Sequence, residues 1–170
     1  MDNNFILKKV RYALNLDDFQ LIDIFKLGGI ELTRSEVCNY CVKFDDEIYQ
    51  ECDDETLQAF LDGLIIYKRG KPKDGNSVKS YERLDNNMIL RKLRIALNFK
   101  DEEMLEVLKL DGMEFSKNQL SALFRAKDNH HYQACKDQLL RKFVQGLVKK
   151  YREQGKGGRK SSAILDFENF

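Results

Sequence analysis

The sequence is short of the residues that interrupt helices. Proline occurs once and glycine ten times in 170 residues, whereas 42% of the residues are hydrophobic and 34% are charged. So few chain breakers favour long helices over a turn-rich β-architecture. The apolar fraction is typical of a folded globular protein rather than a disordered chain. These shortages predict an all-α fold.

Net charge and long apolar runs are also missing. The 29 Lys and Arg residues almost cancel the 28 Asp and Glu residues, which leaves a formal charge of +1. Nucleic-acid binding would therefore need local basic patches. No apolar run approaches the roughly 20 residues that cross a bilayer, and residues 1–4 do not begin an export signal. Four cysteines without regular spacing are typical of reduced thiols. We expect a cytoplasmic protein that does not enter a membrane.

What the sequence does have is an internal repeat. Residues 3–69 align with residues 86–152 at a constant offset of 83, without a gap, and about 24 of the 67 pairs are identical. We predict a first helical repeat at residues 1–69, a linker at 70–85, a second helical repeat at 86–152 and a C-terminal tail at 153–170. A unit of this size buries only about 60% of its surface alone, so the two repeats are expected to pack together.

Each repeat shows four segments with helical periodicity, which predicts a tandem duplication of a four-helix unit with about eight helices in all. The first segment is expected to start at Asn3 or Asn4 as N-cap, as in the second copy, with Lys9 on its solvent side. Gly29 and its counterpart Gly112 end the second segment, and are expected to adopt a left-handed conformation.

The third segment has the clearest start signal. Thr33 with Glu36 forms a capping-box pattern, which Ser116 with Gln119 repeats in the second copy. We expect Phe44 to extend the buried stripe of this segment. The fourth segment, from about residue 53 to residue 69, has its core positions in the same register as its counterpart. These positions are Leu57, Phe60, Leu61, Leu64 and Ile65, matched by Leu140, Phe143, Val144, Leu147 and Val148.

Several residue groups invite a chemical interpretation that their context does not favour. Cys38-x-x-Cys41 lacks the βαβ context of a redox pair and the four ligands of a zinc site, so half-buried free thiols are favoured. His130 and His131 could reach one metal ion only with help from other residues, and a solvated loop is favoured. The acidic stretch at residues 45–55 contains no glycine, which a calcium loop requires. We expect neither a metal nor a cofactor.

Motifs of common enzyme classes are absent. The sequence has no G-x-S-x-G, Walker A, G-x-G-x-x-G or H-E-x-x-H pattern. Only two histidines are present, which leaves little general-base machinery of that type. We expect no enzyme, and no catalytic residue is assigned, although a site assembled only in the folded chain would escape a search for motifs.

Basic residues are the most suggestive feature. They end both repeats and recur on the first segments, where they could form one positive face suited to phosphates. The alternative is that these cations complement helix C-termini or solvate outer faces. The candidate binding surface comprises Lys8, Arg11, Lys68, Arg69, Lys71, Arg91, Arg94, Lys149, Lys150 and Arg152.

The second and third segments also resemble a helix-turn-helix, joined by residues 28–32. The turn is longer than the usual 3–4 residues. The supposed recognition helix offers Arg34 and Glu36, which is poor equipment for reading base edges. The tail ends in Ile164-Leu165-Asp166-Phe167-Glu168-Asn169-Phe170, whose apolar residues could dock on the body of the protein or on a partner.

Three stretches together resemble the YehS-like family of uncharacterised bacterial proteins (domain of unknown function 1456). They are residues 3–14, residues 27–29 and residues 60–70, which read Phe-Leu-Asp-Gly-Leu-Ile-Ile-Tyr-Lys-Arg-Gly. The similarity covers both repeats. It implies a small, soluble, duplicated helical protein and transfers no catalytic or ligand residue. The tail lies outside the resemblance.

Three functions stay open. The leading hypothesis is a non-enzymatic helical module that binds a protein as adaptor or regulator. The first alternative is a nucleic-acid-binding protein that uses the Lys/Arg faces and the helix-turn-helix-like hairpin. The second alternative is a small-molecule-sensing regulatory domain with its pocket at the junction of the repeats. A homo-oligomer is compatible with each of them.

Overall fold

The computed structural model describes residues 1–73 and 82–153, so the predicted tail after residue 153 and the middle of the predicted linker lie outside the described residues. All regular structure within these ranges is helical, which confirms the predicted all-α fold. The α-helices are α1 (Asn3–Ala13), α2 (Asp18–Leu27), α3 (Arg34–Cys41), α4 (Asp54–Arg69), α5 (Asn86–Leu97), α6 (Asp101–Leu110), α7 (Lys117–Leu123) and α8 (Asp137–Val148), followed by the π-helix η1 (Lys149–Glu153).

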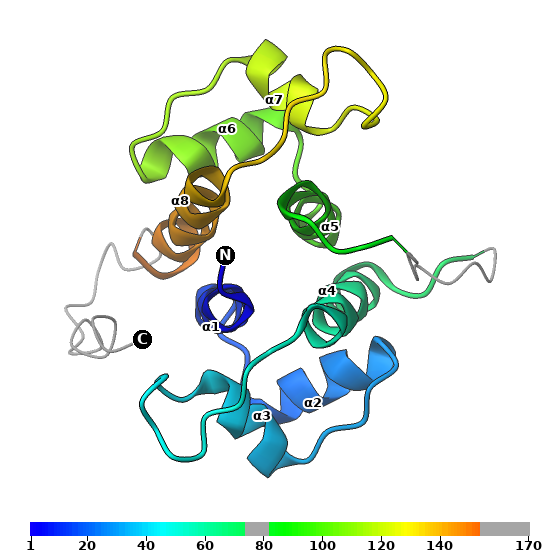
Figure 1. Cartoon of the computed structure of the whole chain (residues 1–170), viewed down its shortest axis with the longest axis vertical. Helices are drawn as coiled ribbons and strands as arrows, with labels where there is room; N and C mark the ends of the chain where they lie inside the picture. Colours follow the sequence, from blue (N-terminus) through cyan, green and yellow to red (C-terminus); the bar gives the residue numbers. More distant parts are fainter. Residues whose placement is uncertain (74–81, 154–170) are drawn as a thin grey trace.

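The two copies are arranged about a pseudo-two-fold axis. Helices α1, α4, α5 and α8 form a central square, with α2 and α3 outside one edge and α6 and α7 outside the opposite edge (Figure 1). Helix α4 packs on α5, and α1 packs on α8, which is the symmetry-related pair. The duplication with its halves packed together is confirmed, and most of the contact between central helices joins one repeat to the other.

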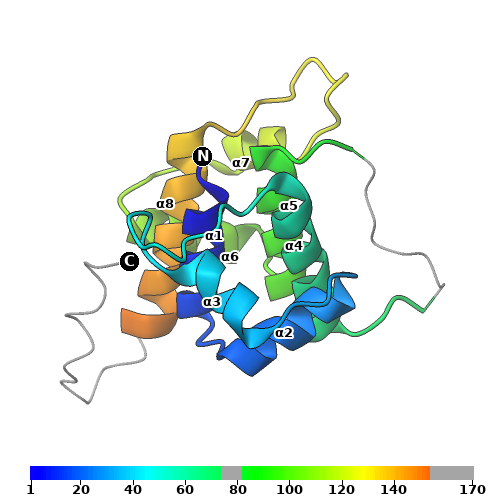
Figure 2. The same ribbon diagram turned by 60° about the horizontal axis from the view of Figure 1, so that its bottom comes forward.

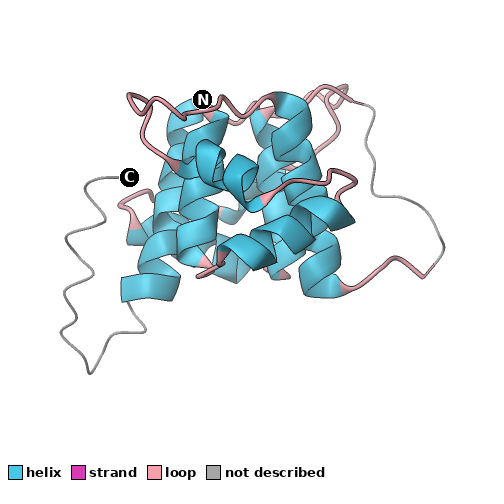
Figure 3. Ribbon diagram, turned by 90° about the horizontal axis from the view of Figure 1, so that it is seen from below, coloured by secondary structure: helices cyan, strands magenta, loops and turns pink. Residues whose placement is uncertain are grey.

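The four central helices run in the same direction. At one end the Asn4 side chain accepts a hydrogen bond from the backbone of Cys52, and the amino terminus of Met1 pairs with Asp137 at 3.0 Å, so the N-terminal ends lie together. At the other end Arg69 binds Asn98, just beyond α5. Figures 2 and 3 show the outer helices lying across this bundle. Parallel helices align their dipoles, and acidic N-termini with basic C-termini offset the resulting repulsion.

The buried Asn4 and its half-buried counterpart Asn87 each tie the start of the first helix of their repeat to the chain before the fourth helix. The Asn4 amide donates to the carbonyls of Tyr40 and Gln50 at 3.0 and 2.8 Å, and its oxygen accepts from the Cys52 backbone at 2.8 Å. Asn87 makes the matching three bonds in the second repeat. The expected N-caps at the asparagines were wrong, because Asp2 and Asp85 cap these helices and leave the asparagines free to bridge.

A second correction concerns the lysines of the first helices. Lys9 was expected to face solvent, but it is buried, as is its counterpart Lys92. The Lys92 ammonium forms a buried ion pair with Asp62 of α4. Gln145 stands at the position of Asp62 in the second repeat. Burial and the charge of Lys8 lower the pKa of Lys9. The long lysine stem therefore packs as an apolar group between helices.

Close helix crossings explain the shared glycine of the fourth helices. A Cβ at Gly63 would lie 1.8 Å from the carbonyl oxygen of Ile24, and one at Gly146 would lie 2.1 Å from that of Val107. A second crossing contact differs between the copies. Gly28 lies against Ala59 in the first repeat, whereas the matching residues of the second repeat form the Asp111–Lys142 ion pair at 3.2 Å.

The predicted starts of the third helices are confirmed, whereas the predicted extent of α3 is not. Both capping boxes, at Thr33 and at Ser116, are present, and Gly29 and Gly112 have positive φ as expected. The placement of Phe44 in the core was wrong, since α3 ends at Cys41 and Phe44 is 82% exposed. It packs edge-on against Tyr49 in the following loop instead.

The buried ion pair between the repeats gives the first prediction. Lys92→Met leaves the Asp62 carboxylate buried without the Lys92 ammonium, and we expect it to lower the free energy of unfolding by about 3–5 kcal/mol. The double variant Asp62→Leu with Lys92→Met removes both charges and should recover most of this loss. Urea denaturation followed by circular dichroism measures both. Equal stability of the single and double variants would contradict the role of the pair.

The asparagine bridge gives the second prediction. Asn4→Leu leaves two buried carbonyls and one N–H without the amide that binds them, so the free energy of unfolding should fall by at least about 2 kcal/mol. Asn3→Ala is the matched control, because the Asn3 side chain binds only at the exposed surface, to Asp54. Chemical denaturation measures the free energy of unfolding of both variants. Equal values for Asn4→Leu and Asn3→Ala would show that the bridge is dispensable.

Candidate functional site

The arginines of α1 and α5 lock the turn that follows each helix. Arg11 donates to the Leu16 carbonyl at 3.1 Å and pairs with Asp18 at 2.6 Å. Arg94 makes the same two contacts in the second repeat, to Phe99 and Asp101. Their recurrence at equivalent positions favours a structural role for both residues of the predicted surface.

Other members of the predicted surface bind the ends of neighbouring helices. Lys8 donates to the Val42 carbonyl and Arg91 to the Phe124 carbonyl, where the third helices end. Lys149 reaches the Leu110 carbonyl at the end of α6. These contacts are the ones expected of cations at helix C-termini. Whether these residues also bind a ligand stays a prediction.

The remaining cations gather where the central helices end. Lys68 and Arg69 line a hollow of about 460 Å³ at the junction of the repeats, together with Tyr151. Lys150 pairs loosely with Glu106 at 3.5 Å. Arg152 stacks on Tyr12, with 4.7 Å between its guanidinium carbon and the ring centre, and its buried Nε has no hydrogen-bond partner among residues 1–73 and 82–153. Lys71 is exposed. The ten residues are thus spread over several helix ends.

The structure also places the weaker candidates. Arg34 of the supposed recognition helix is bound to Asp18. His130 and His131 are exposed in the loop before α8. Within residues 1–73 and 82–153, no three His, Cys, Asp or Glu side chains are arranged to hold a metal ion, and no helix could cross a membrane.

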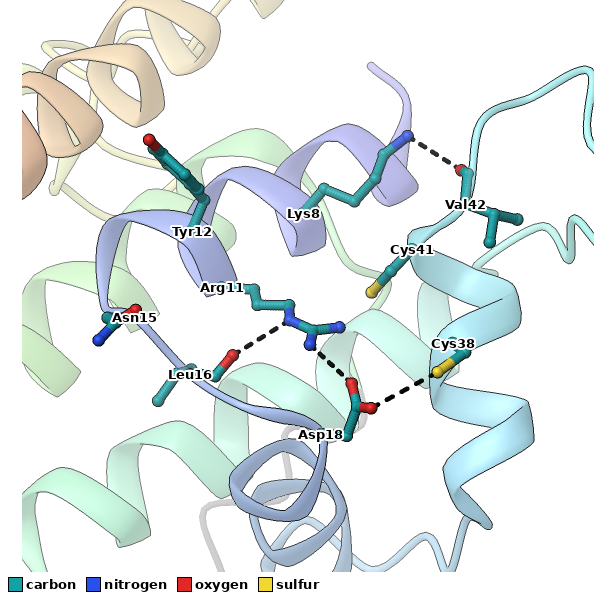
Figure 4. A pocket seen from close by; sticks show the side chains of 9 residues that line it. All are labelled: Lys8, Arg11, Tyr12, Asn15, Leu16, Asp18, Cys38, Cys41 and Val42. Atoms are coloured by element: carbon teal, nitrogen blue, oxygen red, sulfur yellow. Dashed lines mark hydrogen bonds and ion pairs between the residues drawn. The ribbon is translucent and has the colours of Figure 1, made fainter. Parts of the chain in front are cut away.

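A cavity of about 340 Å³ opens between α1 and α3 of the first repeat (Figure 4). Arg11 points into it from α1, and Asp18 faces Arg11 from the start of α2. The thiols of Cys38 and Cys41 lie on its α3 side, with the Cys41 sulfur turned toward Arg11. Its remaining walls are Lys8, Tyr12, Asn15, Leu16 and Val42.

The charges around this cavity are fixed by contacts between side chains. Hydrogen bonds from Arg34 and Arg11 hold the pKa of Asp18 below its usual range, so it stays a carboxylate. Burial raises the pKa of the Cys41 thiol, against the opposing effect of Arg11. Two cations, Lys8 and Arg11, and the Asp18 carboxylate line a largely apolar space, and Arg34 binds Asp18 from outside it. The site therefore suits an apolar group that carries negative charge.

The second repeat shows why the first one is hollow. Phe124 occupies the position of Cys41, and its ring lies 4.7 Å from the guanidinium carbon of Arg94. Phe99 likewise replaces Leu16. The first repeat retains the arginine and its aspartate but has smaller side chains at both places. The cavity thus lies where the second repeat holds an aromatic ring beneath an arginine.

Another hollow, of about 460 Å³, lies between α4, α5 and the loop after α7. Two of its lysines are engaged within the chain, since Lys92 pairs with Asp62, and Lys127 pairs with Asp85 at 2.8 Å. The α1–α3 cavity is better suited to a ligand because it opens two thiols and a half-buried arginine to one apolar space.

Reasoning from the sequence identified part of this site but not the cavity. Lys8 and Arg11 belonged to the predicted surface, and the two cysteines were interpreted as free thiols, which they are. Asp18, Asn15 and Leu16 were missed. The available signal was the alignment of Cys41 with Phe124 at equivalent positions of the two repeats. A much smaller side chain at an otherwise similar position leaves space.

Comparison with known proteins identifies relatives without an assigned activity. Residues 3–70 and 86–153 each match the family model described as "Protein of unknown function (DUF1456)". The chain is 37% identical over 148 residues to "Uncharacterized protein YehS" of Escherichia coli (strain K12), an alignment that covers 87% of this chain and 95% of that protein. No solved structure matches the chain.

The buried thiols give the third prediction. Burial raises the pKa of Cys52 and of Cys135 to about 12, so both stay protonated at pH 8. Because thiolates are the nucleophiles, iodoacetamide should leave these two residues unmodified until the protein unfolds. Peptide mass spectrometry after timed labelling measures each cysteine separately. Rapid labelling of Cys52 or Cys135 in the folded protein would be the contrary result.

Proposed function

The chain belongs to the DUF1456 family, and we propose that it is a protein-interaction module that binds an acidic segment of a partner through a phenylalanine side chain. The proposed binding site is the α1–α3 cavity of the first repeat. The observation that supports it is internal to the chain. Where the second repeat packs the half-buried Phe124 ring against Arg94, the first repeat has the smaller Cys41 beside Arg11, and a cavity opens there.

The size of the cavity favours a small occupant. Its volume of about 340 Å³ is close to the lower end of the roughly 300–1,000 Å³ typical of small-molecule pockets. A single aromatic side chain suits it better than a large cofactor. Cation–π contact with Arg11 would add to the burial of the ring.

The surrounding charge favours carboxylates beside that ring. Arg11 and Arg34 bind the Asp18 carboxylate, and Lys8 adds a further cation to the cavity wall, where it binds the Val42 carbonyl. Acidic residues on either side of a phenylalanine would meet Lys8 and Arg34 at the edge, while the ring enters beneath Arg11. Such complementarity contributes mainly to specificity and association rate, and the ring supplies most of the affinity.

The nucleic-acid alternative has less support. Arg11, Arg91 and Arg94 are engaged by carbonyls or carboxylates of the chain itself, which reduces their capacity for phosphates. Absence of retardation of mixed DNA and RNA in a low-salt gel shift would dismiss this alternative.

Peptide binding gives the fourth prediction. A fluorescent ten-residue peptide with a central Asp-Phe-Glu should bind the full chain, and the Asp-Ala-Glu version should bind roughly ten- to hundredfold more weakly, since burying a phenylalanine contributes about 1.5–3 kcal/mol. Cys41→Phe fills the cavity as Phe124 does in the second repeat, and should abolish binding while preserving the fold. Fluorescence anisotropy measures the affinities.

The control for that experiment is Phe124→Cys, which opens the matching space in the second repeat and leaves the first repeat unchanged. It should bind the peptide as the wild type does. Any added site beside Arg94 would only strengthen the binding of the peptide to this control. Phenylacetate serves as a competitor, and tighter binding of phenylacetate than of the peptide would contradict the proposal and favour a small-molecule ligand. Unchanged peptide affinity in Cys41→Phe would refute the proposed site.

A further inference from the structure

The sequence itself contains a segment of the chemistry that the cavity suits. Residues 164–170 read Ile-Leu-Asp-Phe-Glu-Asn-Phe, in which Asp166 and Glu168 flank Phe167. We propose that Phe167 of the same chain occupies the α1–α3 cavity, so that the tail competes with partners for the site. This inference rests on the proposed function, and adds to it the identity of an internal competitor.

The first argument is the position at which the described chain ends. Arg152, next to the final described residue, stacks on Tyr12 at 4.7 Å. Tyr12 is itself a wall of the cavity. The chain therefore leaves η1 beside the site. Residues 154–166 lie between η1 and Phe167, and thirteen residues can span up to about 40 Å, which is ample for a neighbouring cavity.

The second argument is complementarity of charge and shape. Asp166 and Glu168 are the only acidic residues of the sequence after Glu153, and they flank an aromatic residue. Lys8 and Arg11 line the cavity, Arg34 binds its Asp18 wall, and the smaller Cys41 stands where the second repeat has Phe124. The tail thus supplies the ring that the first repeat lacks.

Covalent attachment makes such an intramolecular contact effective even when it is weak. A tethered segment acts at an effective concentration on the order of millimolar. A partner would bind only in the fraction of molecules whose site is open, so its apparent affinity falls by that fraction. The tail would then restrict the site to partners present at high concentration or with stronger motifs.

The test uses Phe167→Ala in the full chain and the cavity cysteines as reporters. If the tail occupies the site about nine-tenths of the time, removal of the ring should raise the alkylation rate of Cys38 and Cys41 by on the order of tenfold. Cys52 and Cys135 serve as controls for the integrity of the fold, because they should stay protected. Phe170→Ala is the matched control variant, and should leave the rates unchanged. Unchanged rates at Cys38 and Cys41 in Phe167→Ala would overturn the proposal.

Peptide affinity separates this inference from the proposed function. The Asp-Phe-Glu peptide should bind Phe167→Ala about tenfold more tightly than the wild type. Equal, measurable affinities would refute the internal competitor and leave the binding function standing. No binding to either protein would refute the binding function. Protection of Cys38 that disappears on dilution would show that the tail comes from a second copy, and would also overturn the intramolecular proposal.

Discussion

The fold depends on the packing of each repeat against the other. Within a repeat the first and fourth helices share limited contact, whereas α1 lies along α8 and α4 along α5 across the pseudo-two-fold axis. The buried Lys92–Asp62 pair sits in this interface. Side chains that a single repeat would leave in water are thereby buried, which offsets the entropy of ordering so small a unit. The outer helix hairpins and the cavity between α1 and α3 keep their geometry because this central bundle holds α1 in place.

Some of the differences between the two copies are compensated by a second change at a neighbouring position. The Gly28–Ala59 contact of one repeat corresponds to the Asp111–Lys142 pair of the other, so a close backbone approach has been exchanged for an ion pair. At the Cys41 and Phe124 positions there is no such compensation inside the first repeat, and a cavity results. The scaffold is symmetric, but the first repeat has smaller side chains than the second at Cys41 and at Leu16, where the cavity lies.

Sequence patterns predicted the positions of the helices better than the contacts that individual side chains make. Helical periodicity and the capping signals at Thr33 and Ser116 are local, so the helices and several of their ends were identified correctly. Periodicity could not show that Lys9 faces another helix, because a lysine stem suits both water and an interface. Asn4 was assigned as a cap for a similar reason, since an amide can cap a helix or bridge distant carbonyls.

The errors about Phe44 and the cavity share a physical origin. Both depend on where the chain goes after α3, which is set by tertiary contacts and not by the pattern of the helix itself. Phe44 falls beyond the end of α3 and therefore lies outside the stripe that its spacing suggested. The cavity beside Cys41 is formed by residues of α1, α2 and α3 together. Comparison of the two copies was the one sequence-based route to it.

The parallel direction of the central helices bears on how the two repeats are connected. Arg69 ends α4 at one pole of the bundle, whereas Asn86 begins α5 at the other, near the start of α4. The connecting residues must cover the length of a sixteen-residue helix, about 24 Å. Two separate single-repeat polypeptides would need no such connection and would meet about a true two-fold axis. The molecule therefore has the geometry of a homodimer whose two subunits are joined in one polypeptide, so that each half can change in sequence independently of the other.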